Sequence, residues 1–176
     1  MSKLVAAVVV SALVGCSSHT LRSAQPVPLA PWVAFVESQR YTQTVLIRHK
    51  EQVYRLLCVL ELGERGLVLV AFTELGQRLF TLEYGPDRLS IDRSPALPTS
   101  FNVKLVLADL QLVYWPLNDI QHSLKPGWSL VESAADNTRH LMHGDETVAD
   151  VHRSVGVTAI RRPQLGYQMT IEAVSN

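Results

Sequence analysis

Apolar and polar residues alternate along most of the chain between residues 41 and 92. Such alternation predicts strands, because successive side chains of a strand point to opposite faces of a sheet. In the segment 52–62, Tyr54, Leu56 and Cys58 share one face, whereas Arg55 and Glu61 lie on the other. Short glycine-containing turns such as 63–66 separate these runs and favour an antiparallel meander. The strands expected in this half of the chain are 41–49, 52–62, 67–73, 77–84 and 88–92.

The spacing of apolar residues changes in the segment 101–114. Leu107, Leu110 and Tyr114 follow one another at intervals of three or four, which predicts a helix with one apolar stripe. Pro116 ends this helix, and 117–124 is expected to form a second, shorter one. Alternation then returns. The strands expected in the second half are 128–132, 139–143, 147–152, 155–161 and 166–174.

The order of strands, two helices and strands again predicts a mainly β (α+β) domain. Nine or ten strands suit one large antiparallel sheet that curls into a half-open β-barrel, with the helices on its concave side. Several of these strands are apolar on both faces. That pattern is compatible with a hydrophobic cavity inside the half-barrel and equally with a well-filled core.

The N-terminal segment has the features of a signal peptide. Lys3 precedes an apolar run at 4–14, which is shorter than the roughly twenty residues that span a bilayer. The run ends in the sequence Leu-Val-Gly-Cys at 13–16, the pattern of a lipobox. We therefore expect residues 1–15 to be a signal peptide and Cys16 to be an acylated N-terminus, held in a membrane by its acyl chains. A secretory signal that happens to contain a cysteine is the alternative.

The residues that follow predict a tether and a location. Ser17 after the cysteine favours export to the outer membrane, where the anchored protein would face the periplasm. The segment 16–31 contains serine, threonine and three prolines and is interpreted as a flexible tether. The remaining residues 32–176 are enough for a single domain with its own core.

Composition narrows the classes of function. The formal net charge is +0 and there is no basic stripe, so nucleic-acid binding has no electrostatic support. The two cysteines are Cys16 and Cys58. With Cys16 acylated, Cys58 has no intrachain partner for a disulfide, and its place in an apolar strand predicts a small buried side chain.

Candidate catalytic and metal-binding residues form no recognisable motif. His140, His143 and His152 lie close in sequence, but no spacing matches a helical zinc motif, and His140 and His143 would point to opposite faces of a strand. We expect surface histidines, no metal and no other cofactor. Neither a Gly-x-Ser-x-Gly motif nor a glycine-rich phosphate loop is present, so we expect no catalytic residues and no enzyme. Asp109 is expected to cap the helix or form an ion pair.

Two segments resemble known lipoproteins. Residues 72–76 (Phe-Thr-Glu-Leu-Gly) and 115–120 (Trp-Pro-Leu-Asn-Asp-Ile), with Leu124 and Gly127, are similar to the outer-membrane lipoprotein-localisation factor family (LolA/LolB-like). Residues 75–80 and 107–117 resemble more closely an uncharacterised lipoprotein family that accompanies aryl-polyene biosynthesis genes. The resemblance spans about 40–175, and 107–117 is its most specific part.

The resemblance implies a half-open barrel with a helical lid over a hydrophobic cavity that takes acyl chains, handed over by a periplasmic carrier. Leu75 and Gly76 would form a membrane-insertion loop, although Glu74 stands where that family commonly has proline and Leu75 could instead fold into the core. The expected function is to bind a lipid or acylated cargo, such as an aryl-polyene lipid, for transfer or placement in the envelope. The alternatives are an interaction module for another envelope protein and an enzyme acting on a lipid. The residues implied for the lid are Leu107, Leu110, Tyr114, Trp115, Pro116 and Leu117.

Overall fold

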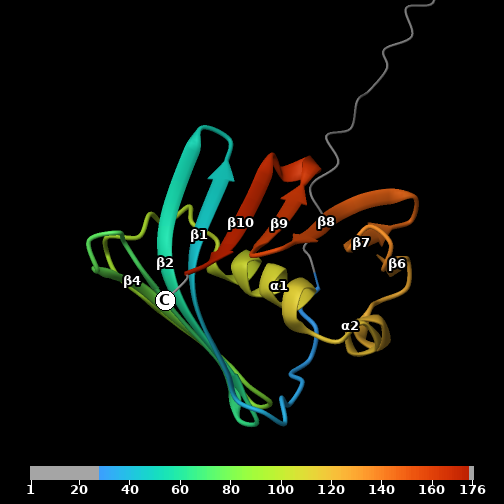
Figure 1. Ribbon diagram of the computed structural model, residues 1–176, viewed down its shortest axis with the longest axis horizontal. Helices are drawn as coiled ribbons and strands as arrows, with labels where there is room; N and C mark the ends of the chain where they lie inside the picture. Colours follow the sequence, from blue (N-terminus) through green and yellow to red (C-terminus); the bar gives the residue numbers. More distant parts are fainter. Residues whose placement is uncertain (1–27, 175–176) are drawn as a thin grey trace, which may run out of the picture.

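The computed structural model describes residues 28–174, which form one ten-stranded antiparallel sheet and two α-helices (Figure 1). The strands lie in the order β5-β4-β3-β2-β1-β10-β9-β8-β7-β6, so two meanders meet where β1 pairs with β10. The sheet curls but does not close, because β5 and β6 remain as its two edges. The strand bounds are β1 Gln39–His49, β2 Gln52–Gly63, β3 Gly66–Phe72, β4 Arg78–Tyr84, β5 Leu89–Arg93, β6 Trp128–Ser133, β7 Thr138–His143, β8 Glu146–Ser154, β9 Val157–Arg162 and β10 Tyr167–Ala173.

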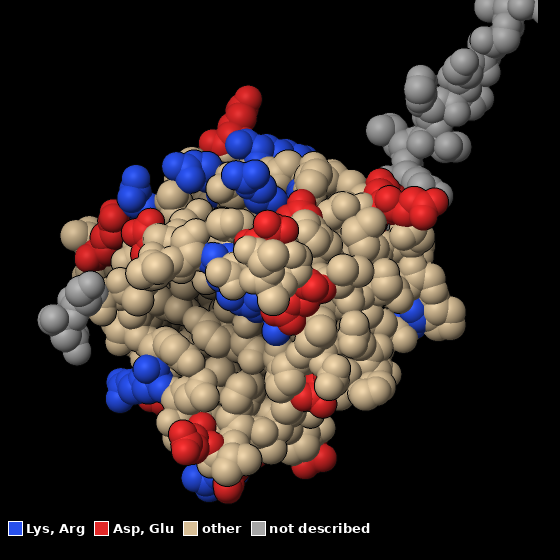
Figure 2. Space-filling view, turned by 45° about the vertical axis from the view of Figure 1, so that its right-hand side comes forward, with Lys and Arg blue, Asp and Glu red and all other residues tan. Residues whose placement is uncertain are grey.

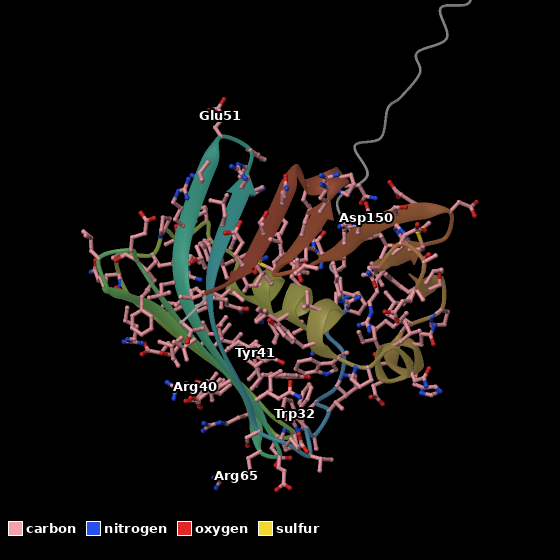
Figure 3. All side chains as sticks on the ribbon, viewed as in Figure 1. Trp32, Arg40, Tyr41, Glu51, Arg65 and Asp150 are labelled. Atoms are coloured by element: carbon pink, nitrogen blue, oxygen red, sulfur yellow. The ribbon has the colours of Figure 1, made fainter. Side chains whose placement is uncertain are left out.

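The antiparallel order gives the sheet two distinct ends. The turns at 50–51, 73–77, 144–145 and 163–166 and the loop 94–102 lie at one end, which we call the upper end. The turns at 64–65, 85–88, 134–137 and 155–156 lie at the other, the lower end. Figure 3 shows Glu51 at the upper tip and Arg65 at the lower one.

Helix α1, Val103–Tyr114, lies in the concave face of the sheet (Figure 1). Its apolar stripe is buried there, with Leu107 and Leu110 almost fully enclosed. The Asn102 side chain caps the helix by accepting a hydrogen bond from the Leu105 N–H. The second helix, α2, Leu117–Ser123, follows after Trp115 and Pro116 and contacts the edge strand β6.

Two arginines of the sheet bind the C-terminal end of α1. Arg139 on β7 donates through Nη1 to the carbonyls of Leu112 (3.0 Å) and Trp115 (2.7 Å). Arg153 on β8 donates through Nη2 to the Val113 carbonyl (3.1 Å). The last carbonyls of a helix have no partner within it and carry partial negative charge, so these cations both satisfy and stabilise them.

The segment before β1 packs as a strap across the C-terminal end of α1. The backbone of Ala30 exchanges two hydrogen bonds with the Gln111 side chain (2.9 and 2.8 Å), and the Trp115 indole N–H donates to the Pro31 carbonyl (3.1 Å). The Trp32 ring contacts those of Trp115 and Tyr84. Packing therefore begins before Trp32, within the stretch that composition alone assigns to the tether.

The structure confirms the predicted architecture: a mainly β domain, a half-open sheet and helices on the concave side. The differences lie at connections. Val155 was expected within a strand, but Gly156 has φ +72° and the pair forms the turn between β8 and β9. A short 3-10 helix, Pro163–Leu165, joins β9 to β10. Among residues 28–174, no helix is long and apolar enough to cross a bilayer.

Candidate functional site

A largely apolar pocket of about 210 Å³ opens at the upper end of the sheet, beside the N-terminal turn of α1. Strands β1, β2 and β10 form one wall, and the loop before α1 with the first turn of the helix forms the other. The lining residues are Ile47, His49, Tyr54, Ser100, Phe101, Asn102, Leu105, Val106, Leu165 and Tyr167.

Aromatic rings give the pocket its shape. Tyr54 and Phe101 meet edge to face, with ring centroids 5.0 Å apart, and His49 and Tyr167 meet at 6.3 Å. Phe101 is held in place because Arg93 donates through Nη1 to its carbonyl (2.9 Å). Offset and edge-on ring contacts of this kind stabilise beyond the area they bury. The walls are therefore pre-formed and present ring edges and methyl groups to a ligand.

A buried ion pair lies behind Tyr167. Arg162 on β9 donates through Nε to Asp109 Oδ1 on α1 (2.8 Å), its Nη2 lies 2.6 Å from the same oxygen, and both side chains are fully enclosed. Asp109 Oδ2 and Arg162 Nη1 have no hydrogen-bond partner among the described residues. The expectation that Asp109 forms an ion pair is confirmed.

Burial is the main cause of the pKa shifts of Asp109 and Tyr167. It raises the pKa of Asp109, against the opposing effect of the Arg162 charge. The pKa of Tyr167 lies well above its usual value, first because the hydroxyl is buried and second because the Asp109 charge opposes ionisation. The Tyr167 hydroxyl therefore stays neutral at neutral pH, with the Tyr167 side chain forming part of the pocket lining.

The rest of the concave interior is packed. Leu107, Leu110 and Trp115 point into one continuous core with Phe80 and Leu141. Near the middle of the sheet the Tyr114 hydroxyl donates to Gln43 Oε1 (2.9 Å), and Tyr41 contacts the Tyr114 ring. Figure 3 shows Tyr41 on this inner side. The helices thus fill most of the concave face and leave the pocket at the N-terminal end of α1.

The residues implied for the lid divide between core and surface. Leu107, Leu110 and Trp115 are buried, Tyr114 and Leu117 are half-buried, and Pro116 is exposed. None of them lines the pocket. The residues that do were missed because they come from three strands, two connections and α1, and alternation alone cannot show which of these meet.

The hairpin between β3 and β4 carries Leu75 at its tip. The Thr73 N–H donates to the Gln77 carbonyl (2.8 Å), and Gly76 takes φ +80°, a conformation that favours glycine. The Leu75 side chain is 97% exposed, so it does not fold back into the core. The hairpin belongs to the upper end, the end where the pocket opens. Its insertion into a membrane stays a prediction.

Among the described histidines, only His49 lines the pocket. His140 contacts Asp150 through Nδ1 (2.7 Å) on the outer face of the sheet, and the His143 ring contacts the Trp128 ring at a tilt of 42°. Among the described residues no three His, Cys, Asp or Glu side chains are placed to hold a metal ion. Cys16 lies outside the described residues.

Cys58 is a free, buried thiol on β2. Burial raises its pKa to about 12. We predict that in a Cys16→Ser chain at pH 8, iodoacetamide alkylates Cys58 at least about a thousandfold more slowly when native than when unfolded, because the thiolate fraction falls tenfold per pKa unit. The guanidinium-unfolded chain is the control. Rapid alkylation of the native chain would show that this strand opens readily.

Residues 40–175 match the family described as Protein of unknown function (DUF3261). The chain belongs to this family. The DUF3261 region covers all ten strands apart from the first residue of β1, both helices, the pocket and the Asp109–Arg162 pair, but not the strap. The resemblance to an uncharacterised family is thereby confirmed. A search of the curated proteins gave no match.

Proposed function

We propose that this DUF3261 protein is a non-catalytic envelope lipoprotein that holds the apolar end of a lipid or acyl-like molecule in the pocket beside α1. The observation that carries the proposal is a pre-formed, largely apolar hollow in a concave face that is otherwise packed. An apolar cavity of about 150 Å³ can accept one benzene ring. The hollow of about 210 Å³ therefore suits an aryl ring or the end of an acyl chain, not a whole lipid.

The remainder of such a ligand has a path out of the pocket. A second, more open groove of about 440 Å³ shares Ser100, Phe101 and Asn102 with the pocket and continues past Arg93 and Lys104. A chain whose end lies against Tyr167 would leave along this groove towards the upper end. The groove is wide and polar enough for the less apolar part of the molecule.

The expected lipid anchor and the exposed β3–β4 hairpin would both place the pocket near a membrane. Acylation of Cys16 would hold the protein on the periplasmic side of the outer membrane, and a periplasmic carrier would deliver the cargo. Leu75 would enter the bilayer at the end where the pocket opens, and burying a leucine stabilises by roughly 1.5–3 kcal/mol. The resemblance to lipoproteins of aryl-polyene gene clusters supports an aryl-polyene lipid as cargo. The aryl ring of such a lipid would pack against the aromatic side chains of the pocket.

The test is to purify the acylated protein gently from its own host and analyse the extracted lipids by mass spectrometry, beside Leu75→Glu and Val155→Glu. Val155 is equally exposed at the lower end and serves as the matched control. We expect a stoichiometric lipid or polyene with all three proteins, and impaired delivery to the membrane only with Leu75→Glu. Protein without any bound apolar molecule would contradict the proposal.

A second candidate is an interaction module for another envelope protein. Its support is an apolar stripe on the convex face, where Leu57 pairs with Phe72 and Val59 with Val70 across β2 and β3. Leu57 is 38% exposed and the other three are half-buried. Exposed apolar patches of this kind commonly mark contact surfaces.

Photo-crosslinking in the native envelope separates the two candidates. A photoreactive residue at position 105 lines the pocket, and one at position 57 lies on the convex face. Lipid captured at 105 favours the cargo-binding role. One defined protein captured at 57, with nothing at 105, favours the interaction module.

A further inference from the structure

The convex face at the upper end of the sheet carries a row of outward-pointing cations. Arg48 on β1 pairs in register with Gln168 on β10, which pairs in turn with Arg161 on β9. Neighbouring strands lie about 4.8 Å apart, so the two arginines are separated by about 10 Å along the row. Their neighbours in sequence, Ile47 and Ile160, are buried inside, which places Arg48 and Arg161 outside.

Arg55 and Lys50 extend the row into a patch. Arg55 pairs with Leu46, one step below Arg48 on the same face of the sheet. Lys50 lies in the β1–β2 turn, whose position is fixed because its N–H donates to the Gly166 carbonyl (3.1 Å). Figure 2 shows Lys and Arg side chains gathered at the top of the molecule. We call Arg48, Lys50, Arg55 and Arg161 the basic patch.

The cations of the basic patch are exposed and make no ion pair with any residue of the described chain. In contrast, Arg40, Arg78 and Arg88 elsewhere on the surface are each paired with a carboxylate. The acidic side chains nearest the patch are Glu51, at the hairpin tip, and Asp150, which is the register partner of Arg161 across β8 and β9 and contacts His140 (2.7 Å). The patch therefore keeps a local positive excess on a chain of zero net charge.

The patch adjoins the pocket mouth. The turn that holds Lys50 is flanked by His49, which lines the pocket, and the 163–166 connection contributes Leu165 to the same lining. Val53, in register with Arg48, is 56% exposed and adds an apolar side chain to the charged row. Cations and exposed apolar groups at one end are the combination that an anionic bilayer surface attracts.

We propose that the basic patch docks on the anionic phospholipid headgroups of a bilayer, so that the pocket mouth lies at the membrane surface. The inference rests on the proposed function, because this orientation would let cargo pass between the bilayer and the pocket without crossing water. The docking itself depends only on the charges. Each cation near an anionic surface strengthens binding severalfold, and salt weakens it.

The test is co-sedimentation of residues 16–176 with Cys16→Ser, which lack both the expected signal peptide and the acylation site, on phosphatidylcholine vesicles with and without about 30 mol % phosphatidylglycerol. The probe variant is Arg48→Gln/Arg161→Gln. The control is Arg65→Gln/Lys125→Gln, which removes the same charge from exposed cations outside the patch. We expect the probe variant to lower the partition coefficient on anionic vesicles by about tenfold or more, and the control by less than about twofold.

Equal loss in the two variants, or equal binding to neutral vesicles, would overturn the docking proposal. Binding of a fluorescent fatty-acid probe in solution is measured on the same proteins, because it reports the pocket alone. If the protein binds the fatty-acid probe but shows no selective vesicle binding, the docking proposal is wrong and the proposed function stands. If it binds anionic vesicles selectively but does not bind the probe, the proposed function is wrong and the docking proposal stands.

Discussion

Asp109→Ala is expected to lower the free energy of unfolding by about 3–5 kcal/mol, because it leaves the Arg162 guanidinium fully buried without its counter-charge. Arg162 points inward from β9 and cannot reach solvent without moving the strand. Guanidinium-induced unfolding followed by far-UV circular dichroism measures the change. Arg40→Ala breaks an exposed ion pair with Glu61 and is the control, with an expected loss below about 1 kcal/mol.

A double replacement distinguishes the cost of an unpaired charge from a specific need for the pair. Asp109→Leu/Arg162→Met removes both charges and keeps apolar volume, so we expect most of the lost stability to return. If Asp109→Ala costs no more than Arg40→Ala, the pair is not buried as described. If the double variant is as unstable as Asp109→Ala, packing around the site and not charge sets the cost.

Leu105→Trp is expected to weaken binding of an apolar chain by about tenfold or more, which corresponds to at least about 1.4 kcal/mol. Leu105 is a half-buried pocket residue on the first turn of α1, so a larger ring occupies the hollow without disturbing the core. Titration with a fluorescent fatty-acid probe measures the affinity. Leu117→Trp makes the same change at a half-buried position on α2 outside the pocket.

The Leu117→Trp control should bind the probe with less than about twofold change, and both variants should keep their unfolding free energy within about 1 kcal/mol. A Leu105→Trp protein that binds as tightly as the unchanged chain would place the apolar ligand elsewhere. Parallel loss in both variants would indicate a general effect on folding.

Much of the fold was predictable because a half-buried sheet records its two faces in the sequence. On β2, Leu56, Cys58 and Leu60 alternate with exposed or half-buried residues, and the structure keeps that register. The helix stripe through Leu107 and Leu110 was equally clear, since a helix against a sheet needs apolar residues at that spacing. Element ends were less certain because turns depend on single residues, such as Gly156 before β9.

The buried polar contacts were less predictable because they depend on which elements meet. An ion pair was one expectation for Asp109 from its place within a predicted helix, but nothing in the sequence indicated Arg162 as its partner. On β9, Thr158, Ile160 and Arg162 are every second residue and therefore point to the same, inner face. This spacing alone indicated that Arg162 points inward. The packing of the strap was not predictable, because a proline-rich composition usually indicates a flexible tether. Here the strap is ordered because the Gln111 side chain hydrogen-bonds to both the N–H and the carbonyl of Ala30.

The volume of the pocket could not be predicted from the alternation of apolar and polar residues. A filled and a hollow half-barrel have the same sequence pattern, and the difference rests on how far Leu105 and Phe101 close over Ile47 and Tyr167. Those positions follow from the loop 94–102, which Arg93 fixes by donating to the carbonyls of Pro98 and Phe101. Loop geometry of this kind is set by single hydrogen bonds and not by periodicity.

The pocket beside α1 is expected to bind the end of an apolar chain. The most direct measurement is a methyl-labelled NMR titration of the chain with a medium-chain fatty acid below its micellar concentration. We predict saturable shifts that concentrate on Ile47, Leu105, Val106 and Leu165, with Leu57 on the convex face unmoved. Shifts confined to Leu57 and its convex neighbours, or no saturable shifts at the pocket, would contradict it.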